Sequence, residues 1–167
     1  LPIICRNLAV AGIKLDRRAD ARASVDEGLR ENPDDPYLLG LKGMLTAREA
    51  PAAAESLFAR SRELGDASPE FLAQYGILLL NEGRPHEAVA ILEDASRRRP
   101  DDGEIGLLLA DALDRAGRSR EAEDVLRRLL ARGADAGIPR ERIEERLARA
   151  LFHEADYEGA LDIYRSL

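Results

Sequence analysis

Two histidines, His86 and His153, are each followed by a glutamate, as at the start of a zinc-protease helix. Such a helix needs a second histidine four positions after the first, so that both imidazoles reach one metal ion. Ala90 and Tyr157 occupy those positions, so the motif is incomplete in both places. We therefore interpret the two histidines as surface residues of helices and predict no metal site around them.

Other candidate motifs are also incomplete. Residues 101–104 (DDGE) are as acidic as a calcium loop, but they lack its alternating ligands and its closing glutamate. Asp102 is better interpreted as the N-cap of the next helix. The serines lie outside any GxSxG turn, and the sequence contains no GxxxxGK phosphate loop. The sequence therefore predicts no catalytic residue and no cofactor.

The single cysteine, Cys5, has no histidine in an obvious partner position, and we predict a buried apolar thiol. One cysteine cannot form an internal disulfide or a cysteine-based zinc site. The basic run 97–99 (RRR) is typical of a helix C-terminus, which favours cations. Charges four apart, such as Arg142 with Arg146 and Glu141 with Glu145, are interpreted as a solvated helix surface.

The composition narrows the fold class. Of the 167 residues, 45% are hydrophobic and 34% charged, with no Trp, three Phe and four Tyr, so the core must be built mostly from aliphatic side chains and alanine. Good helix formers dominate and β-branched residues are few, which argues against a β-sandwich or barrel. A net charge of −7 argues against nucleic acid as a partner. No apolar run approaches the roughly 18 residues that a membrane span needs.

Two series of small residues repeat along the chain with one period. The first has separations of 34, 34 and 38 residues, and the second has separations of 34, 33, 34 and 38. Both include the same four-residue insertion, near residues 137–140. Small residues at fixed intervals let paired helices approach closely. The series are Ala54, Ala88, Ala122, Ala160, and Ala9, Gly43, Gly76, Ala110, Ala148.

Residues 69–102 show how each repeat is built. Pro69 suits the first position of one helix and Pro85 that of the next, and Pro36 and Pro51 have the same role in the preceding repeat. Gly83 can adopt the left-handed conformation that ends the first helix, and Gly117 repeats this role. Pro100 ends the second helix, because proline cannot continue it. The first helix carries an apolar stripe at spacings of three and four: Leu72, Tyr75, Gly76 and Leu79.

This pattern of residues resembles a tetratricopeptide repeat, a helix–turn–helix unit of 34 residues. The resemblance implies an all-α, right-handed solenoid of antiparallel helix hairpins with a concave face lined by the first helix of each unit. We expect residues 1–167 to form a single repeat domain, part of a longer protein. Its units are expected at about 2–35, 36–68, 69–102, 103–136 and 141–167, the second with a turn one residue shorter.

The resemblance also implies a function, because a concave face of this kind binds a segment of another protein. We expect a scaffold or adaptor that is not an enzyme, and its Arg-rich composition favours a bacterial assembly, secretion or envelope system. Cytoplasm and periplasm both remain open. The family positions predict a partner-binding groove that includes Tyr37, Met44, Arg48, Ala73, Ile77, Asn81, Leu107, Asp111, Arg115 and Arg149.

Some alternatives stay open, and one is excluded. Chaperone-binding members of the family hold a C-terminal carboxylate with a Lys/Asn/Arg clamp. Here the matching positions carry other residues, so no EEVD-type ligand is expected. The solenoid could instead self-associate through exposed apolar residues of its last unit, or be the regulatory arm of an enzyme. The clamp positions carry Gly40, Met44, Gln74, Glu104 and Leu108, and the exposed apolar residues would include Leu161, Tyr164 and Leu167.

Overall fold

The computed structural model describes residues 2–65 and 68–167 of the chain, which hold ten α-helices, one short 3-10 helix and no strand. In the same residues, no helix is both long and apolar enough to cross a membrane. The elements are α1 (Pro2–Lys14), α2 (Arg18–Glu31), α3 (Pro36–Thr46), α4 (Pro51–Glu63), α5 (Pro69–Asn81), α6 (Pro85–Arg98), α7 (Gly103–Arg115), α8 (Ser119–Arg132), η1 (Gly133–Ala136), α9 (Arg140–His153) and α10 (Tyr157–Ser166).

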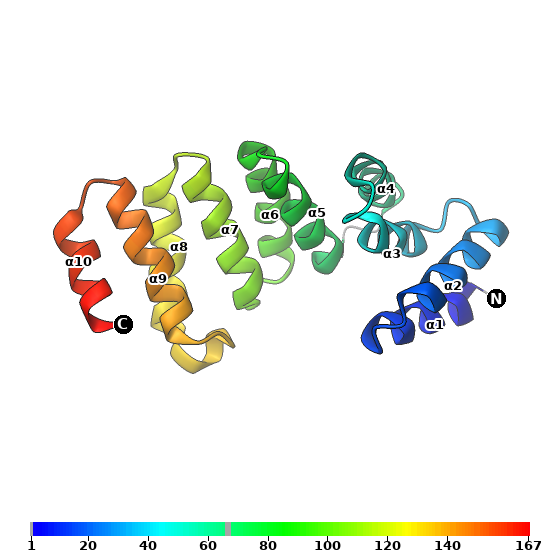
Figure 1. Ribbon diagram of the computed structural model, residues 1–167, viewed down its shortest axis with the longest axis horizontal. Helices are drawn as coiled ribbons and strands as arrows, with labels where there is room; N and C mark the ends of the chain where they lie inside the picture. Colours follow the sequence, from blue (N-terminus) through cyan, green and yellow to red (C-terminus); the bar gives the residue numbers. More distant parts are fainter. Residues whose placement is uncertain (1, 66–67) are drawn as a thin grey trace. The chain divides into compact units, whose positions relative to one another are not determined.

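The chain divides into two compact units, residues 1–78 and 79–167, and the division falls within α5. In the first unit α1 packs on α2, α2 on α3, and α3 on α4. In the second unit each helix from α6 to α10 packs on the next, and α7 also contacts α9 (Figure 1). Contacts within a repeat and between consecutive repeats are typical of a repeat protein.

Helix starts follow the sequence signals. Each of the four prolines predicted to open a helix is its first residue. Asp102 caps α7 as predicted, since its Oδ1 accepts a hydrogen bond from the backbone N–H of Ile105 at 3.2 Å. Asp35 and Asp156 cap α3 and α10 in the same way. These caps fix where the first helices α3 and α7 and the second helix α10 begin.

The turns inside the helix pairs follow the predicted backbone pattern. Gly83 and Gly117 have φ of 73° and 75°, the left-handed conformation that ends α5 and α7. Asp16 and Ala155 adopt it at the equivalent turns without being glycine. The pair α3 and α4 differs from the others: α3 ends at Thr46, four residues link it to α4 instead of three, and Ala50 in this link has φ of −141°. The residue that the second repeat lacks is therefore not missing from the turn, as we predicted, but from α3, which has 11 residues where α5 has 13.

The small residues lie where helices meet. All nine members of the two predicted series are buried. Ala21 is equally buried and extends the first series, 33 residues before Ala54. A Cβ atom at Gly43 would lie 2.8 Å from the ring of Phe58, and one at Gly12 only 3.0 Å from the Cβ of Ala21. The close approach predicted from the sequence is therefore confirmed.

Aromatic side chains contribute more to the first unit than composition suggested. Phe58 and Tyr75 stack with ring centroids 5.7 Å apart, and Tyr37 and Phe71 lie 5.2 Å apart. Most of the chain's few aromatic residues are therefore concentrated around α3, α4 and α5. The buried core of the second unit is aliphatic and alanine-rich, as predicted.

Candidate functional site

The predicted groove residues lie on the first helices of the repeats, except Arg48, which lies in the turn after α3. The two units are described separately. In the first unit these helices are α1, α3 and residues 69–78 of α5, and in the second they are α7 and α9. We call the surface they present the first-helix face of each unit. The first unit holds Tyr37, Met44, Arg48, Ala73 and Ile77, and the second holds Asn81, Leu107, Asp111, Arg115 and Arg149.

The first-helix face of the first unit contains a pocket of about 190 Å³. Ile13 from α1, Met44 from α3 and Gln74 from α5 line it, so three consecutive first helices contribute. Ile13 and Met44 are half-buried, and a thioether side chain adapts its shape to different apolar partners. The pocket is large enough for one apolar side chain of a ligand.

Charged side chains surround this pocket. Asp16 and Arg18 belong to its lining, and Arg22 forms an ion pair with Glu49 at 2.6 Å. The hydrogen bond from Arg22 lowers the pKa of the Glu49 carboxyl, and the charges of Arg18 and Arg48 act in the same direction. Lys14 and Arg48 are exposed at equivalent positions of the first two repeats. The lining itself therefore carries one cation, Arg18, and one carboxylate, Asp16.

Tyr37 is held by its neighbours. The guanidinium of Arg6 lies 5.4 Å from the centre of the Tyr37 ring and donates a hydrogen bond of 2.7 Å to the buried carboxylate of Asp35. Tyr37 also packs on Phe71 and is only half exposed. These contacts leave only part of the Tyr37 side chain open to a ligand.

The first-helix face of the second unit is a network of charges between α7 and α9. Asp111 pairs with Arg146 at 3.2 Å and also with Arg149. Asp114 accepts a hydrogen bond from Arg149 at 3.0 Å, and its Oδ1 lies 2.7 Å from Nδ1 of His153. These pairs join residues 35 to 39 positions apart, so they connect one repeat to the next.

Asp114 is the buried centre of this network, with only 3% of its side chain exposed. Burial raises the pKa of its carboxyl, but hydrogen bonds from His153, Ser119 and Arg149 outweigh it, and the pKa lies below its usual range. The pKa of Arg149 is raised: burial lowers it, but the hydrogen bonds to Asp111 and Asp114 raise it by more than burial lowers it. The network therefore stabilises the charged forms of Asp114 and Arg149 and links α7 to α9. These groups are not arranged as the acid and base of a catalytic site.

The interpretation of Arg142 and Arg146 as part of a merely solvated surface was wrong. Arg142 reaches back 38 residues to Glu104 with an ion pair of 2.5 Å, and Arg146 reaches Asp111. Both are cross-repeat contacts, because helix stacking places the start of α9 beside the start of α7. No sequence spacing within one helix could reveal them.

Two predicted groove residues are covered. Leu107 has 2% of its side chain exposed and Ala73 has 8%, so neither presents a surface to a ligand. Both point into the packing between helices, and we correct their assignment accordingly. Ile77 is half-buried, and Arg48, Asn81 and Arg115 are exposed, with Arg115 donating a hydrogen bond to the carbonyl of Leu80.

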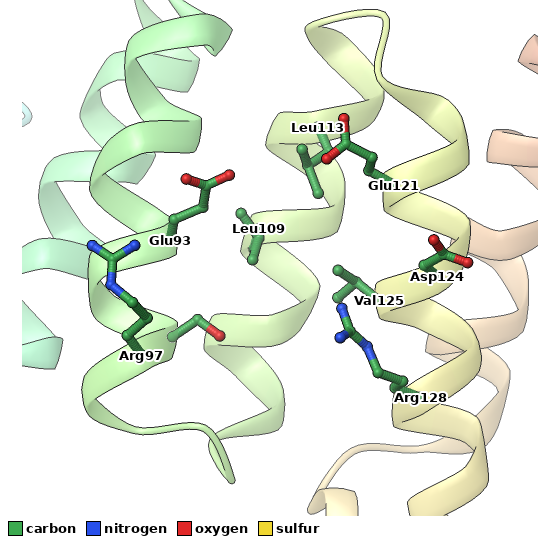
Figure 2. Close-up of a pocket in the computed structure, with 9 residues that line it drawn as sticks. Glu93, Arg97, Leu109, Leu113, Glu121, Asp124, Val125 and Arg128 are labelled. Carbon is green, nitrogen blue, oxygen red and sulfur yellow. The ribbon is translucent and has the colours of Figure 1, made fainter.

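The second unit also has a groove that the sequence did not indicate, formed by the second helices α6 and α8 (Figure 2). It encloses about 290 Å³ above the buried side chains of Leu109 and Leu113 on α7. Its walls carry charges of both signs: Glu93 and Arg97 from α6 and Glu121, Asp124 and Arg128 from α8. Arg118 bridges the same two helices through Glu93 and Glu121.

The candidate catalytic and metal-binding residues of the sequence, His86, His153 and Cys5, are not brought together in the structure. Within residues 2–65 and 68–167, no group of three or more His, Cys, Asp or Glu side chains is placed to hold a metal ion. Cys5 is buried, as predicted. His86 is exposed in the first turn of α6, and His153 ends α9 beside Asp114.

Comparisons with known proteins agree with this architecture. Residues 79–138 match the family model described as Tetratricopeptide repeat. No curated protein matches the sequence. The structure of YrrB, described as a TPR protein with an unusual peptide-binding site, is similar with a TM-score of 0.84 and 16% identity, over 98% of this chain and 82% of that one.

Two further solved structures have the same fold. MamA (MSR-1) aligns with a TM-score of 0.79 and 18% identity, over 98% of this chain and 92% of that one. PilF of Pseudomonas aeruginosa aligns with a TM-score of 0.78 and 16% identity, over 98% of this chain and 73% of that one. At these identities the likeness concerns the fold alone.

The helix pairs, the cross-repeat contacts and these likenesses define an all-α repeat protein of the solenoid class. More narrowly, residues 79–138 match the tetratricopeptide repeat family, and the chain has the fold of a solved tetratricopeptide repeat protein. Proteins with this repeat are in general protein–protein interaction scaffolds.

Proposed function

We propose that this chain is a scaffold whose first unit binds a segment of a partner protein on its first-helix face. The observation that carries the proposal is the pocket around Met44. In the proposal, one apolar side chain of the partner enters it. Three repeats contribute to the pocket, so the folded stack forms it without a ligand-induced change. That YrrB, a fold neighbour, is described as having a peptide-binding site supports a peptide as the kind of ligand.

The charges around the pocket specify the partner further. Lys14, Arg18 and Arg48 favour a segment in which acidic residues flank the apolar one. A protein partner, not nucleic acid, fits the net charge of −7, and the proposal assigns no catalytic step to this chain. A bacterial assembly, secretion or envelope system remains the proposed context, and PilF is a bacterial example of the fold.

The second unit offers a different kind of surface. Asn81, Asp111, Arg115 and Arg149 remain proposed partner contacts, but the two aspartates of the network are already paired within the protein. A ligand there would have to compete with existing ion pairs, which reduces the free energy that its binding can gain. We therefore propose that the first unit provides the apolar anchor and that this polar face contributes selectivity.

The test is a selection of peptides from a random library on the purified chain, followed by fluorescence anisotropy. We expect an apolar residue with acidic neighbours to be enriched, with a dissociation constant of about 1–10 μM. Met44→Glu should weaken binding at least about tenfold, because it places a carboxylate in the pocket. Ala53→Glu, on the exposed side of α4, adds the same charge to a second helix and serves as control. Equal binding by both variants would exclude the pocket as the site.

A further inference from the structure

Almost all charged side chains of α6 and α8 are neutralised within the protein. Among the described residues, every Asp, Glu and Arg of these two helices forms an ion pair, except Asp124 and Arg128 on α8. These two stand four positions apart, a spacing at which an acid and a base on a helix can pair, but they do not pair with each other. Both are exposed, and both line the groove above Leu109 and Leu113. The charges that the two helices leave unpaired therefore lie together in this groove.

The groove has an acidic end and a basic end. Glu93 on α6 and Glu121 on α8 are both paired with Arg118 and lie toward the turn between α7 and α8 (Figure 2). Arg97 on α6 and Arg128 on α8 lie further from this turn. Because Arg128 follows Glu121 by seven residues, the two ends are about 10 Å apart along the helix axis. A ligand that spans the groove therefore needs a basic and an acidic group at about this separation.

Between these ends the groove is apolar. Val125 is half-buried in the α8 wall, and Leu109 and Leu113 of α7 form the floor, with 7% and 3% of their surfaces exposed. The volume of about 290 Å³ accommodates one large apolar side chain. Such a side chain would remove the remaining exposed area of these residues from water, which contributes to the free energy of binding.

The walls also determine the backbone conformation of the ligand. Both walls are helices whose backbone N–H and C=O groups are bonded within the helix, so an extended chain would find no backbone partner in the groove. An α-helix satisfies its own backbone groups. It also presents side chains at positions i, i+4 and i+7 on one face, over the same distance of about 10 Å.

We propose that the groove between α6 and α8 binds an amphipathic helix of a partner protein that carries an acidic, an apolar and a basic residue along one face. The acidic residue contacts Arg97 and Arg128, the apolar residue covers Val125, and the basic residue contacts Glu121 and Asp124. The site does not depend on either end of the sequence, because α6, α7 and α8 are internal helices. It is also independent of the proposed pocket on the first helices of the first unit.

Two labelled peptides test the inference by fluorescence anisotropy on the 167-residue chain. The first is an alanine-rich helix with a glutamate, a leucine four positions later and a lysine three positions after that. The second carries lysine in place of the glutamate. The first should bind at least about fivefold more tightly, because only it matches both ends of the groove. The net charge of −7 favours the second peptide, so a preference for the first would come from the basic end of the groove.

A charge reversal in the groove gives the matched test. Arg128→Glu should remove the preference for the first peptide, because it makes the basic end acidic. Arg62→Glu is the control, since Arg62 is exposed on the second helix α4 and, among the described residues, forms no ion pair. It should leave the preference unchanged. The same measurements on the Met44→Glu chain should give the same preference, which separates this site from the pocket of the first unit.

Three results would overturn the proposal. These are no binding of the first peptide, equal binding of the two peptides, and an unchanged preference in the Arg128→Glu chain. A mass that doubles with concentration, and returns to one chain in the Arg128→Glu variant, would assign the groove to a second copy instead of a partner helix. Circular dichroism checks that the variants are folded, and Arg128→Gln, which should reduce the preference, replaces Arg128→Glu if that variant is not.

Discussion

Replacing Gly43 by alanine tests the packing on which the whole fold depends. Gly43 is buried within α3, and a Cβ atom there would lie 2.8, 3.0 and 3.1 Å from three carbons of the Phe58 ring. Phe58 is itself buried, and its ring stacks on Tyr75 at 5.7 Å between centroids. The ring is therefore packed on Tyr75 as well, which limits how freely it can move away from a new methyl group.

The expected magnitude follows from two opposing effects. Nonbonded carbon atoms prefer a separation of about 3.5 Å, so the ring edge would have to retreat by about 0.7 Å. Overpacking of this kind costs about 1–3 kcal/mol. Alanine is better than glycine inside a helix by about 1 kcal/mol, which offsets part of that cost. We expect the Gly43→Ala variant to lose about 1 kcal/mol of unfolding free energy.

Urea denaturation followed by circular dichroism measures this loss, and hydrogen exchange of the α3 and α4 amides localises it to the first unit. The control is the same substitution in a Phe58→Leu background, where the smaller side chain leaves room for the methyl group. There Gly43→Ala should stabilise, because only the helix preference remains. A gain of about 1 kcal/mol in the wild-type background would refute the claim that glycine is needed for close approach.

Three further outcomes are expected. Ala88→Leu, at a fully buried position of α6, should cost about 1–3 kcal/mol in urea denaturation, and a neutral result would contradict the tight packing there. Ala155→Gly should raise the unfolding free energy by about 0.5–1 kcal/mol in the same assay, because Ala155 has φ of 63° and glycine adopts this conformation freely. The lowered pKa of Asp114 means that its contribution to stability is present above about pH 4, the usual pKa of an aspartate, and is lost as pH falls through the lower folded-state value. Acid titrations of Asp114→Asn should therefore show a shallower loss of stability below about pH 4 than the wild type, and identical curves would argue against the network.

The sequence predicted the helices well because their boundaries depend on local chemistry. Pro69 and Pro85 begin helices, Gly83 ends one, and Asp102 caps another, each by an effect within a few residues. The two series of small residues also allowed tertiary contacts to be predicted, because a fixed period shows which positions meet the neighbouring helix. Ala21 belongs to the first series as well, at a spacing of 33 before Ala54, since the second repeat is one residue shorter between Gly43 and Ala54 than the later repeats are between their small residues.

The candidate site was harder to predict, because helix rotation decides which side chains are exposed. Adjacent residues of a helix point about 100° apart, so an error of one position moves a side chain between groove and core. Leu107 is an example: it is buried, whereas its neighbour Leu108 is half-exposed. The charge network has a signal in the sequence after all, since Asp111 with Arg146 and Asp114 with Arg149 are both 35 residues apart, close to one repeat.

The two first-helix faces differ in what they can still bind. In the second unit, Asp111 and Asp114 are satisfied by cations of the next repeat, and a ligand would have to replace contacts that are already made. In the first unit, the pocket between Ile13, Met44 and Gln74 has apolar surface that no side chain fills, and filling it removes water without breaking an ion pair. The free energy of binding a partner segment should therefore come mainly from the first unit, while the charged network of the second keeps its helices in fixed register.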